Sequence, residues 1–358
     1  MSSRLVDARV RGSRLTLKRM IVGGITALAV TVGSVGAAVA HDANGAADAT
    51  AARGGHAQRE PVVGRAIFDR TFRHGLVHTD GGKVHYVKGG SGPALVLLHG
   101  WPETWWGWHL VMPELAKTHT VIAFDLPGLG YSAIPRDGYD QKTTAARLHQ
   151  AVNRLGYREV KVMGHDMGVL VGYAWARDYP REVTRLAVLD SPLLGFGLED
   201  AYPLSFHFKL NMAPSPVPEK IVDNSDVATY LNYVFEFAAV PDAIDRDSHI
   251  RAYLHPARRS AGYNYYRAWP ENAEDTKANA ESKRLTQPVL AMGAEFVFGL
   301  GVAASFEQVA DDVRGVVAPG AGHWIQEETP EFLIDCANLF FGPEGVPAPT
   351  ESLSSCIA

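Results

Sequence analysis

The chain has 358 residues, of which 46% are hydrophobic, and a formal net charge of −5 at pH 7. It is long and apolar enough for a large core with a second, smaller unit. The first forty residues carry +5, which leaves −10 on the rest and argues against nucleic acid or an anionic membrane surface as a partner.

The N-terminal segment has the order of an export signal. Basic residues precede an uncharged run, Ile21–Ala40, which ends in the small-x-small cleavage site Ala38-Val39-Ala40. We therefore expect a signal peptide over residues 1–40 and a secreted or extracytoplasmic protein that meets a membrane only through this leader. The alternative is an uncleaved anchor, since the run could just span a bilayer, although its glycines and alanines make it weakly hydrophobic.

Residues 41–60 are rich in Ala, Gly and Asp and show no apolar periodicity, which predicts a disordered linker. From residue 61 on, short apolar strands alternate with helical runs such as Thr143–Leu155 and Val169–Asp178. The strands begin with a hairpin over residues 76–90 that turns at Asp80-Gly81. The later strands start at Ala94, centre on Val121 and Val162, end at Asp190 and near Met292, and finally start at Val313. This alternation predicts an α/β fold, a mainly parallel sheet flanked by helices.

The alternation stops between Pro192 and about Leu285, where the sequence is rich in aromatic residues. A helical insertion between two strands of an open sheet predicts a cap over the carboxyl ends of the strands, where catalytic groups of such sheets gather. We therefore expect a core of residues 61–192 and 286–342, a cap of residues 193–285 and a C-terminal tail of residues 343–358.

A sharp turn is expected after the strand around Val162, in Gly164-His165-Asp166-Met167-Gly168. The pattern is that of the Gly-x-Ser-x-Gly turn, which presents a nucleophile between a strand and a helix, with aspartate in place of serine. We interpret Asp166 as a nucleophile. The alternative is an N-cap of the helix that starts near Val169.

The partners of this nucleophile should follow it in the order acid, histidine. His323 comes after the last strand and is the expected general base. For the acid we favour Asp190, at the end of the strand after the nucleophile, over Glu295, which follows the next strand. Either carboxylate could instead be a capping or surface group.

The loop after the strand at Ala94 begins His99-Gly100-Trp101-Pro102. Its position predicts an oxyanion hole made by the backbone N–H groups of Trp101 and Met167.

An aspartate nucleophile indicates displacement at saturated carbon. A serine would form an ether there and stop, whereas a carboxylate forms an ester that a histidine-activated water can hydrolyse. The leaving group would be an epoxide oxygen or a halide. Nucleophile, base and water suffice, so no cofactor and no metal are expected.

Residues 61–342 resemble the epoxide hydrolase and dehalogenase branch of the α/β-hydrolase superfamily, through the loop at His99, the turn at Asp166 and Gly322-His323-Trp324. The resemblance implies an α/β-hydrolase fold with an inserted helical cap. Tyr266 in "YNYYRAWPEN" matches the epoxide hydrolase tyrosine that donates to the epoxide oxygen. His207 in "LSFHFKL" matches a histidine that a secreted bacterial subgroup uses in place of a second tyrosine, and that subgroup takes its acid from the position of Asp190.

Dehalogenases resemble the chain with departures. Haloalkane dehalogenases typically have tryptophan after the nucleophile, and fluoroacetate dehalogenases have arginines, where this chain has Met167 and Leu170. The favoured function is therefore an epoxide hydrolase whose partners are a neutral small-molecule epoxide and water. Dehalogenation is the alternative, because His207 and Tyr266 could also solvate a halide. A hydrolase-fold protein that binds a ligand without turnover is a third reading, disfavoured by the joint presence of the catalytic residues.

The two cysteines, Cys336 and Cys356, lie near the C-terminus and in no metal-binding pattern. They could form a disulfide that ties the tail to the last helix, or remain two separate thiols.

Overall fold

The computed structural model describes residues 68, 70–343 and 347–357. The expected signal peptide, its cleavage after Ala40 and the linker of residues 41–60 lie outside the described residues. In the described part of the chain, every helix is too short or too polar to cross a membrane.

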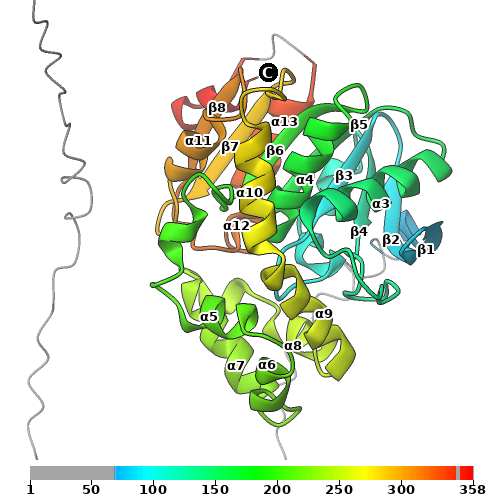
Figure 1. Ribbon diagram of the computed structural model, residues 1–358. Helices are drawn as coiled ribbons and strands as arrows, with labels where there is room; N and C mark the ends of the chain where they lie inside the picture. The colour runs from blue at the N-terminus through cyan, green and yellow to red at the C-terminus, as the bar shows by residue number, and fades with distance from the viewer. Residues whose placement is uncertain (1–67, 69, 344–346, 358) are drawn as a thin grey trace, which may run out of the picture. The chain divides into compact units, whose positions relative to one another are not determined.

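Eight strands form one sheet in the order β1-β2-β4-β3-β5-β6-β7-β8 (Figure 1). The strands are β1 (Phe72–Thr79), β2 (Gly82–Gly90), β3 (Ala94–Leu98), β4 (Thr120–Phe124), β5 (Val160–His165), β6 (Val183–Leu189), β7 (Val289–Ala294) and β8 (Val313–Ala318). β1 and β2 form the predicted hairpin, and β2 pairs antiparallel with β4. All pairs from β4 to β8 are parallel, which confirms the predicted α/β class and mainly parallel sheet.

The middle strands are buried on both faces, which is why they appear in the sequence as continuous apolar runs. Successive side chains of a strand point to opposite faces, so Leu95 and Leu97 join one core cluster while Val96 and Leu98 join the other. The cluster of Val96 includes buried residues of α3 (Gln141–Arg154), α4 (Met167–Asp178) and α11 (Gly301–Phe306). The cluster of Leu95 includes those of α2 (Met112–Leu115) and α13 (Pro330–Phe341). The two layers of helices therefore cover opposite faces of one sheet.

The core helices are α2 (Met112–Leu115), α3 (Gln141–Arg154), α4 (Met167–Asp178), α11 (Gly301–Phe306), α12 (Ile325–Glu328) and α13 (Pro330–Phe341). Two of them, α3 and α4, begin two residues earlier than the starts at Thr143 and Val169 that the sequence pattern predicted. α3 starts at Gln141 because the Asp140 side chain accepts a hydrogen bond from the backbone N–H of Thr143 at 2.8 Å and caps the helix.

Every helix or strand between β6 and β7 is a helix, joined to the next by short loops, and this segment is called the cap below. The helices there are α5 (Phe206–Met212), α6 (Val217–Ile221), α7 (Val227–Val234), α8 (Arg246–Ala252), α9 (Pro256–Arg267) and α10 (Trp269–Asn279), with short 3₁₀ helices at Leu198–Ala201, Phe235–Phe237 and Pro241–Ala243. In Figure 1, α5 to α9 gather at one end of the sheet, and α10 returns toward the core. α10 is tied to the core by hydrogen bonds from Gln141 to Asn272 and from Arg177 to Asp275.

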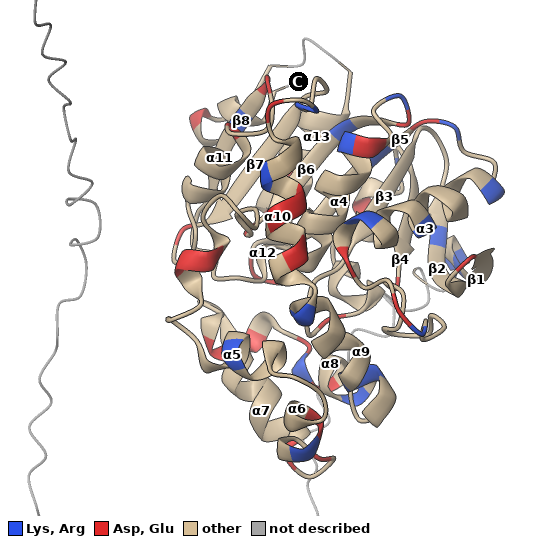
Figure 2. Cartoon of the chain, viewed as in Figure 1, with Lys and Arg blue, Asp and Glu red and all other residues tan. Residues whose placement is uncertain are grey.

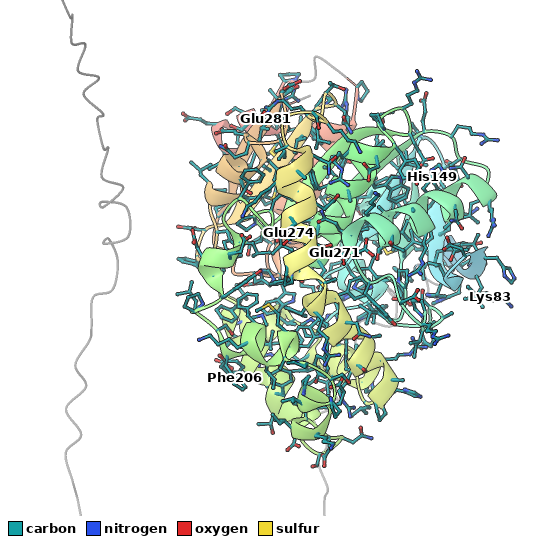
Figure 3. The ribbon with its side chains drawn as sticks, in the orientation of Figure 1. Lys83, His149, Phe206, Glu271, Glu274 and Glu281 are labelled. Carbon is teal, nitrogen blue, oxygen red and sulfur yellow. A yellow bond between two sulfur atoms is a disulfide. The ribbon has the colours of Figure 1, made fainter. Side chains whose placement is uncertain are left out.

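Charges of both signs are interspersed over the described elements (Figure 2). α10 carries acidic side chains along its length, and Figure 3 labels Glu271 and Glu274 on it.

The two cysteines form a disulfide, so the first of the two readings is correct. The bridge joins Cys336 on α13 to Cys356 in a 3₁₀ helix, Glu351–Cys356, near the end of the chain. Leu353 of that helix is buried in the same core cluster as α13. The tail therefore packs against the last helix and is also covalently joined to it.

Candidate active site

Asp166 stands alone between β5, which ends at His165, and α4, which begins at Met167. Its backbone φ is +50°, a conformation that costs free energy for a residue with a side chain. Both glycines of the turn are required sterically. A Cβ on Gly164 would lie 2.3 Å from the Gly168 carbonyl oxygen, and one on Gly168 would lie 2.2 Å from that of Leu98.

The Asp166 carboxylate is held by the loop after β3. Its Oδ1 accepts a hydrogen bond from the backbone N–H of Trp101 at 2.9 Å, and Gly100 leaves the room that this approach needs. Asp166 occupies the N-cap position of α4, but its side chain makes no capping hydrogen bond. Met167, the first residue of α4, adds a backbone N–H that has no acceptor within the helix.

His323 lies between two carboxylates. Its Nδ1 is 2.8 Å from Oδ2 of Asp190, and its Nε2 is 3.6 Å from Oδ2 of Asp166. Burial alone would lower the pKa of His323, but these two carboxylates outweigh it and raise the pKa to about 10. Burial would likewise raise the pKa of Asp166, and the neighbouring His323 imidazole lowers it to about 2.

The structure brings His323 to Asp190 and not to Glu295. Asp190 follows β6 directly, is fully buried and has a φ of +47°. Its second oxygen, Oδ1, accepts a hydrogen bond from the backbone N–H of Ala294 at 2.8 Å. Glu295 is exposed and accepts instead from the backbone N–H of Gly320 at 2.7 Å.

Two cap residues, Tyr266 and His207, contact Trp101 in the loop that holds Asp166. Tyr266 on α9 meets the Trp101 indole edge-on at 5.4 Å between ring centroids, and His207 on α5 stacks on it at 6.1 Å. The Tyr266 and His207 rings also contact each other edge-on, at 6.0 Å. All the residues expected at the site therefore gather around Trp101 and Asp166, with the exception of Glu295.

Burial sets the protonation of both cap groups. It raises the pKa of Tyr266 well above 10, and the nearby negative charge of Asp166 adds to this rise. It lowers the pKa of His207 to about 3. At neutral pH the cap therefore presents a phenol and a neutral imidazole to the core.

A buried hydrogen-bond network that the sequence reasoning missed supports these loops. Glu103 is fully buried and accepts hydrogen bonds from Gly100 N at 3.0 Å, His165 Nδ1 at 2.8 Å and Gln326 Nε2 at 2.7 Å. Nε2 of His165 in turn lies 2.8 Å from the backbone oxygen of His323. Burial alone would raise the pKa of Glu103, but His165 lowers it to about 2.

The network joins the Trp101 loop, the nucleophile turn and the His323 loop. The signal in the sequence was present: the acidic residue Glu103 directly follows His99-Gly100-Trp101-Pro102, and His165 lies inside the nucleophile turn next to Asp166.

Glu103, His249 and Glu327 could geometrically hold a metal ion, since one potential ligand atom from each lies within 4.8 Å of the others. Their carboxylates are already satisfied by N–H donors, however. Glu327 accepts from the backbone N–H of Asp245 at 3.2 Å and pairs with Nε2 of His249 at 3.1 Å. The cluster is best described as a hydrogen-bond network that ties α8 of the cap to the core.

Comparison with known proteins places these observations in a family. The sequence model of the alpha/beta hydrolase fold matches residues 93–330. A soluble epoxide hydrolase of Corynebacterium sp. (strain C12) is 34% identical over 280 residues, which cover 75% of this chain and 97% of that protein. A fluoroacetate dehalogenase of a Burkholderia species is 33% identical over 177 residues, 47% of this chain and 58% of that protein. The solved structure of the epoxide hydrolase CorEH without ligand superposes with a TM-score of 0.71 at 33% identity, covering 75% of this chain and 98% of that one.

Proposed function

This chain belongs to the α/β-hydrolase family, and we propose that it opens a neutral epoxide to a vicinal diol through a covalent ester on Asp166. The observation that carries the proposal is a carboxylate at the nucleophile turn, with His323 on one side and the cap donors His207 and Tyr266 near the same Trp101 loop. The similarity to epoxide hydrolases supports the choice of substrate.

In the first step, Oδ2 of Asp166 attacks an epoxide carbon, because Oδ1 is occupied by the Trp101 N–H. The C–O bond of the epoxide breaks, and its electron pair moves to the leaving oxygen. Tyr266 and His207 donate hydrogen bonds to that oxygen as its negative charge develops, which lowers the barrier. The oxygen takes the hydroxyl proton of Tyr266, which recovers one from water, and the product is a hydroxyalkyl ester of Asp166.

In the second step, His323 removes a proton from a water molecule, which attacks Cγ of the ester. Ester formation has removed the negative charge of Asp166, one of the two charges that raise the pKa of His323, so the imidazole becomes able to act as a base. The tetrahedral oxyanion forms on Oδ1, which already faces the Trp101 N–H, with Met167 N–H as second donor. Asp190 stabilises the imidazolium, which gives its proton to the departing alkoxide oxygen as the C–O bond of the intermediate breaks and the diol leaves. The carboxylic acid left on Asp166 returns its proton to His323, which restores the carboxylate.

Dehalogenation by the same chemistry is the second candidate, favoured by the similarity to a fluoroacetate dehalogenase. Met167 and Leu170 are apolar and nearly fully buried, so they provide no positive charge for a substrate carboxylate. A halide leaves without needing a proton, whereas an alkoxide benefits from donors such as Tyr266. These two features favour the neutral epoxide.

The test is intact-mass analysis of the His323→Gln variant of residues 41–358, in which the ester should accumulate. The variant is incubated separately with 1,2-epoxyhexane and 1-bromohexane, which have one leaving group each. We expect an adduct with the added mass of the whole epoxide, and none when Asp166→Asn is added. A faster adduct with 1-bromohexane would favour the dehalogenase, and no adduct with either, in folded protein, would contradict both.

We also propose that the enzyme acts outside the cytoplasm. The export-like leader and the disulfide between Cys336 and Cys356 support this location, because disulfides persist in oxidising compartments. Fractionation of producing cells followed by intact-mass analysis tests it, with a chain that starts at residue 41 expected in the extracytoplasmic fraction.

A further inference from the structure

Ser205 precedes α5 at its N-cap position and is 2% exposed. A serine at this position normally accepts a hydrogen bond from a backbone N–H of the first turn. Here the side chain makes no such bond. Its Oγ lies instead 2.6 Å from Nδ1 of His207, so the hydroxyl forms a hydrogen bond with the imidazole and does not cap the helix.

The backbone N–H of the next residue, Phe206, bonds a side chain outside α5. Phe206, labelled on α5 in Figure 3, is 56% exposed, whereas His207 after it is buried. The backbone N–H of Phe206 donates to the hydroxyl oxygen of Tyr233 at 3.0 Å, and that hydroxyl is also 3.2 Å from Oγ of Ser205. Tyr233, Ser205 and His207 therefore form one chain of hydrogen bonds.

The donor and acceptor roles in these hydrogen bonds decide which ring nitrogen of His207 carries the hydrogen. Burial lowers the pKa of His207 to about 3, so the imidazole is neutral and has a single N–H. The Tyr233 oxygen accepts from Phe206 and is free to donate its own hydrogen to Ser205. Ser205 then donates to Nδ1, which leaves the hydrogen of the imidazole on Nε2.

The proposed reaction requires the same tautomer. The other tautomer would present a nitrogen lone pair to the leaving oxygen and repel its developing charge. A tyrosine at this position would have no alternative tautomer, because its hydroxyl is the only hydrogen-bond donor of the side chain.

We propose that Ser205, supported by Tyr233, is a positioning residue that holds His207 in the Nε2–H tautomer, so that His207 and Tyr266 both donate to the epoxide oxygen. This inference rests on the proposed function. It assigns a role to Ser205, which lies within the cap segment "LSFHFKL" but to which the resemblance to epoxide hydrolases gave no role.

The test compares Ser205→Ala, Ser205→Thr and Tyr233→Phe, each in the His323→Gln background, by the rate of ester formation from 1,2-epoxyhexane. The matched control is Ser225→Ala, an exposed cap serine whose Oγ bonds Asp223. Loss of a whole oxyanion donor costs about 10²–10³ in rate. Ser205→Ala leaves the imidazole in place, so we expect a fall of about tenfold, with Ser205→Thr within about threefold of the parent, Tyr233→Phe between them and Ser225→Ala unchanged.

A second readout separates positioning from a merely structural role. Nitrogen NMR of ¹⁵N-histidine-labelled protein, with the His207 signals identified by their loss in His207→Phe, should show a hydrogen on Nε2 and none on Nδ1. In Ser205→Ala these two signals should move toward each other as the tautomers mix. Recovery in Ser205→Thr should accompany recovery of the rate.

The outcomes are distinguishable. A parent that forms no ester contradicts the proposed function itself. A parent that forms ester at the same rate as Ser205→Ala, or whose His207 carries its hydrogen on Nδ1, overturns the role of Ser205. If Ser205→Ala does not fold, Tyr233→Phe decides, since Tyr233 is 42% exposed, and an unchanged rate with unchanged His207 signals would again overturn the inference.

Discussion

Nδ1 of His323 lies 2.8 Å from the carboxylate of Asp190, although the two residues are 133 positions apart in the chain. The other oxygen of Asp190 is held by the backbone N–H of Ala294, so the carboxylate is fixed at both ends. Because His323 Nδ1 donates to Asp190, Nε2 of the same ring faces Asp166 and is the nitrogen that acts as the base once the ester has formed. This pairing underlies the first prediction.

Asp190→Asn is expected to stop turnover at the ester. The asparagine oxygen can still accept from Ala294, and its NH₂ group then faces Nδ1, which moves the hydrogen of the imidazole to Nε2. The ester on Asp166 should form and accumulate, while diol production falls by about 10³–10⁴. Rapid-quench intact mass and steady-state diol assays with 1,2-epoxyhexane measure both steps. Glu295→Gln, the matched control, should stay within about twofold of the parent, and equal losses in the two variants would contradict the assignment.

Tyr266→Phe is expected to slow ester formation by about a hundredfold, because one donor to the leaving oxygen is lost. Tyr263→Phe is the matched control on the same helix. Its buried hydroxyl has no hydrogen-bond partner in the described part of the chain, so its removal should leave the rate unchanged. Single-turnover kinetics in the His323→Gln background measure both variants. A loss in Tyr263→Phe as large as in Tyr266→Phe would indicate a general effect of α9 instead.

The free energy of unfolding should depend on pH through His323. Its pKa is raised from 6.5 in the unfolded chain to about 10 in the folded protein. The stabilisation is therefore fully present below about pH 6.5 and is lost as pH rises through about 10. Urea unfolding at pH 6 and pH 10 should show a larger decrease for the parent than for His323→Gln. Asp166→Asn, which removes one of the two neighbouring charges, should show an intermediate decrease, and identical decreases in all three proteins would exclude His323 as the source.

Replacing Cys336 and Cys356 together by serine is expected to lower the free energy of unfolding by about 3 kcal/mol. The bridge closes a loop across a sequence separation of 20, and such a constraint mainly restricts the unfolded chain. Urea unfolding of parent and double variant, each with and without a reductant, measures the difference. Reductant should destabilise the parent alone, and an equal effect on the double variant would point to another cause.

The sequence alone predicted the α/β class, the order of strands and helices and the sharp turn at Asp166. These features depend on local rules: the side chains of Leu95 to Leu98 alternate between two faces, and the turn needs small residues at 164 and 168. The first residue of α3 differs from the predicted one, because the Asp140 cap starts the helix at Gln141 and not at Thr143.

The tertiary structure alone decided which distant groups meet. Asp190 and Glu295 each follow a strand, and the sequence offered both as partners of His323. The burial of Asp190 and its backbone conformation direct only its carboxylate to the imidazole. The contact of Ser205 with His207 and the pairing of the two cysteines were settled in the same way. The physical reason is that periodicity and turn chemistry act over a few residues, whereas these contacts depend on how separate elements pack and on where their side chains then point.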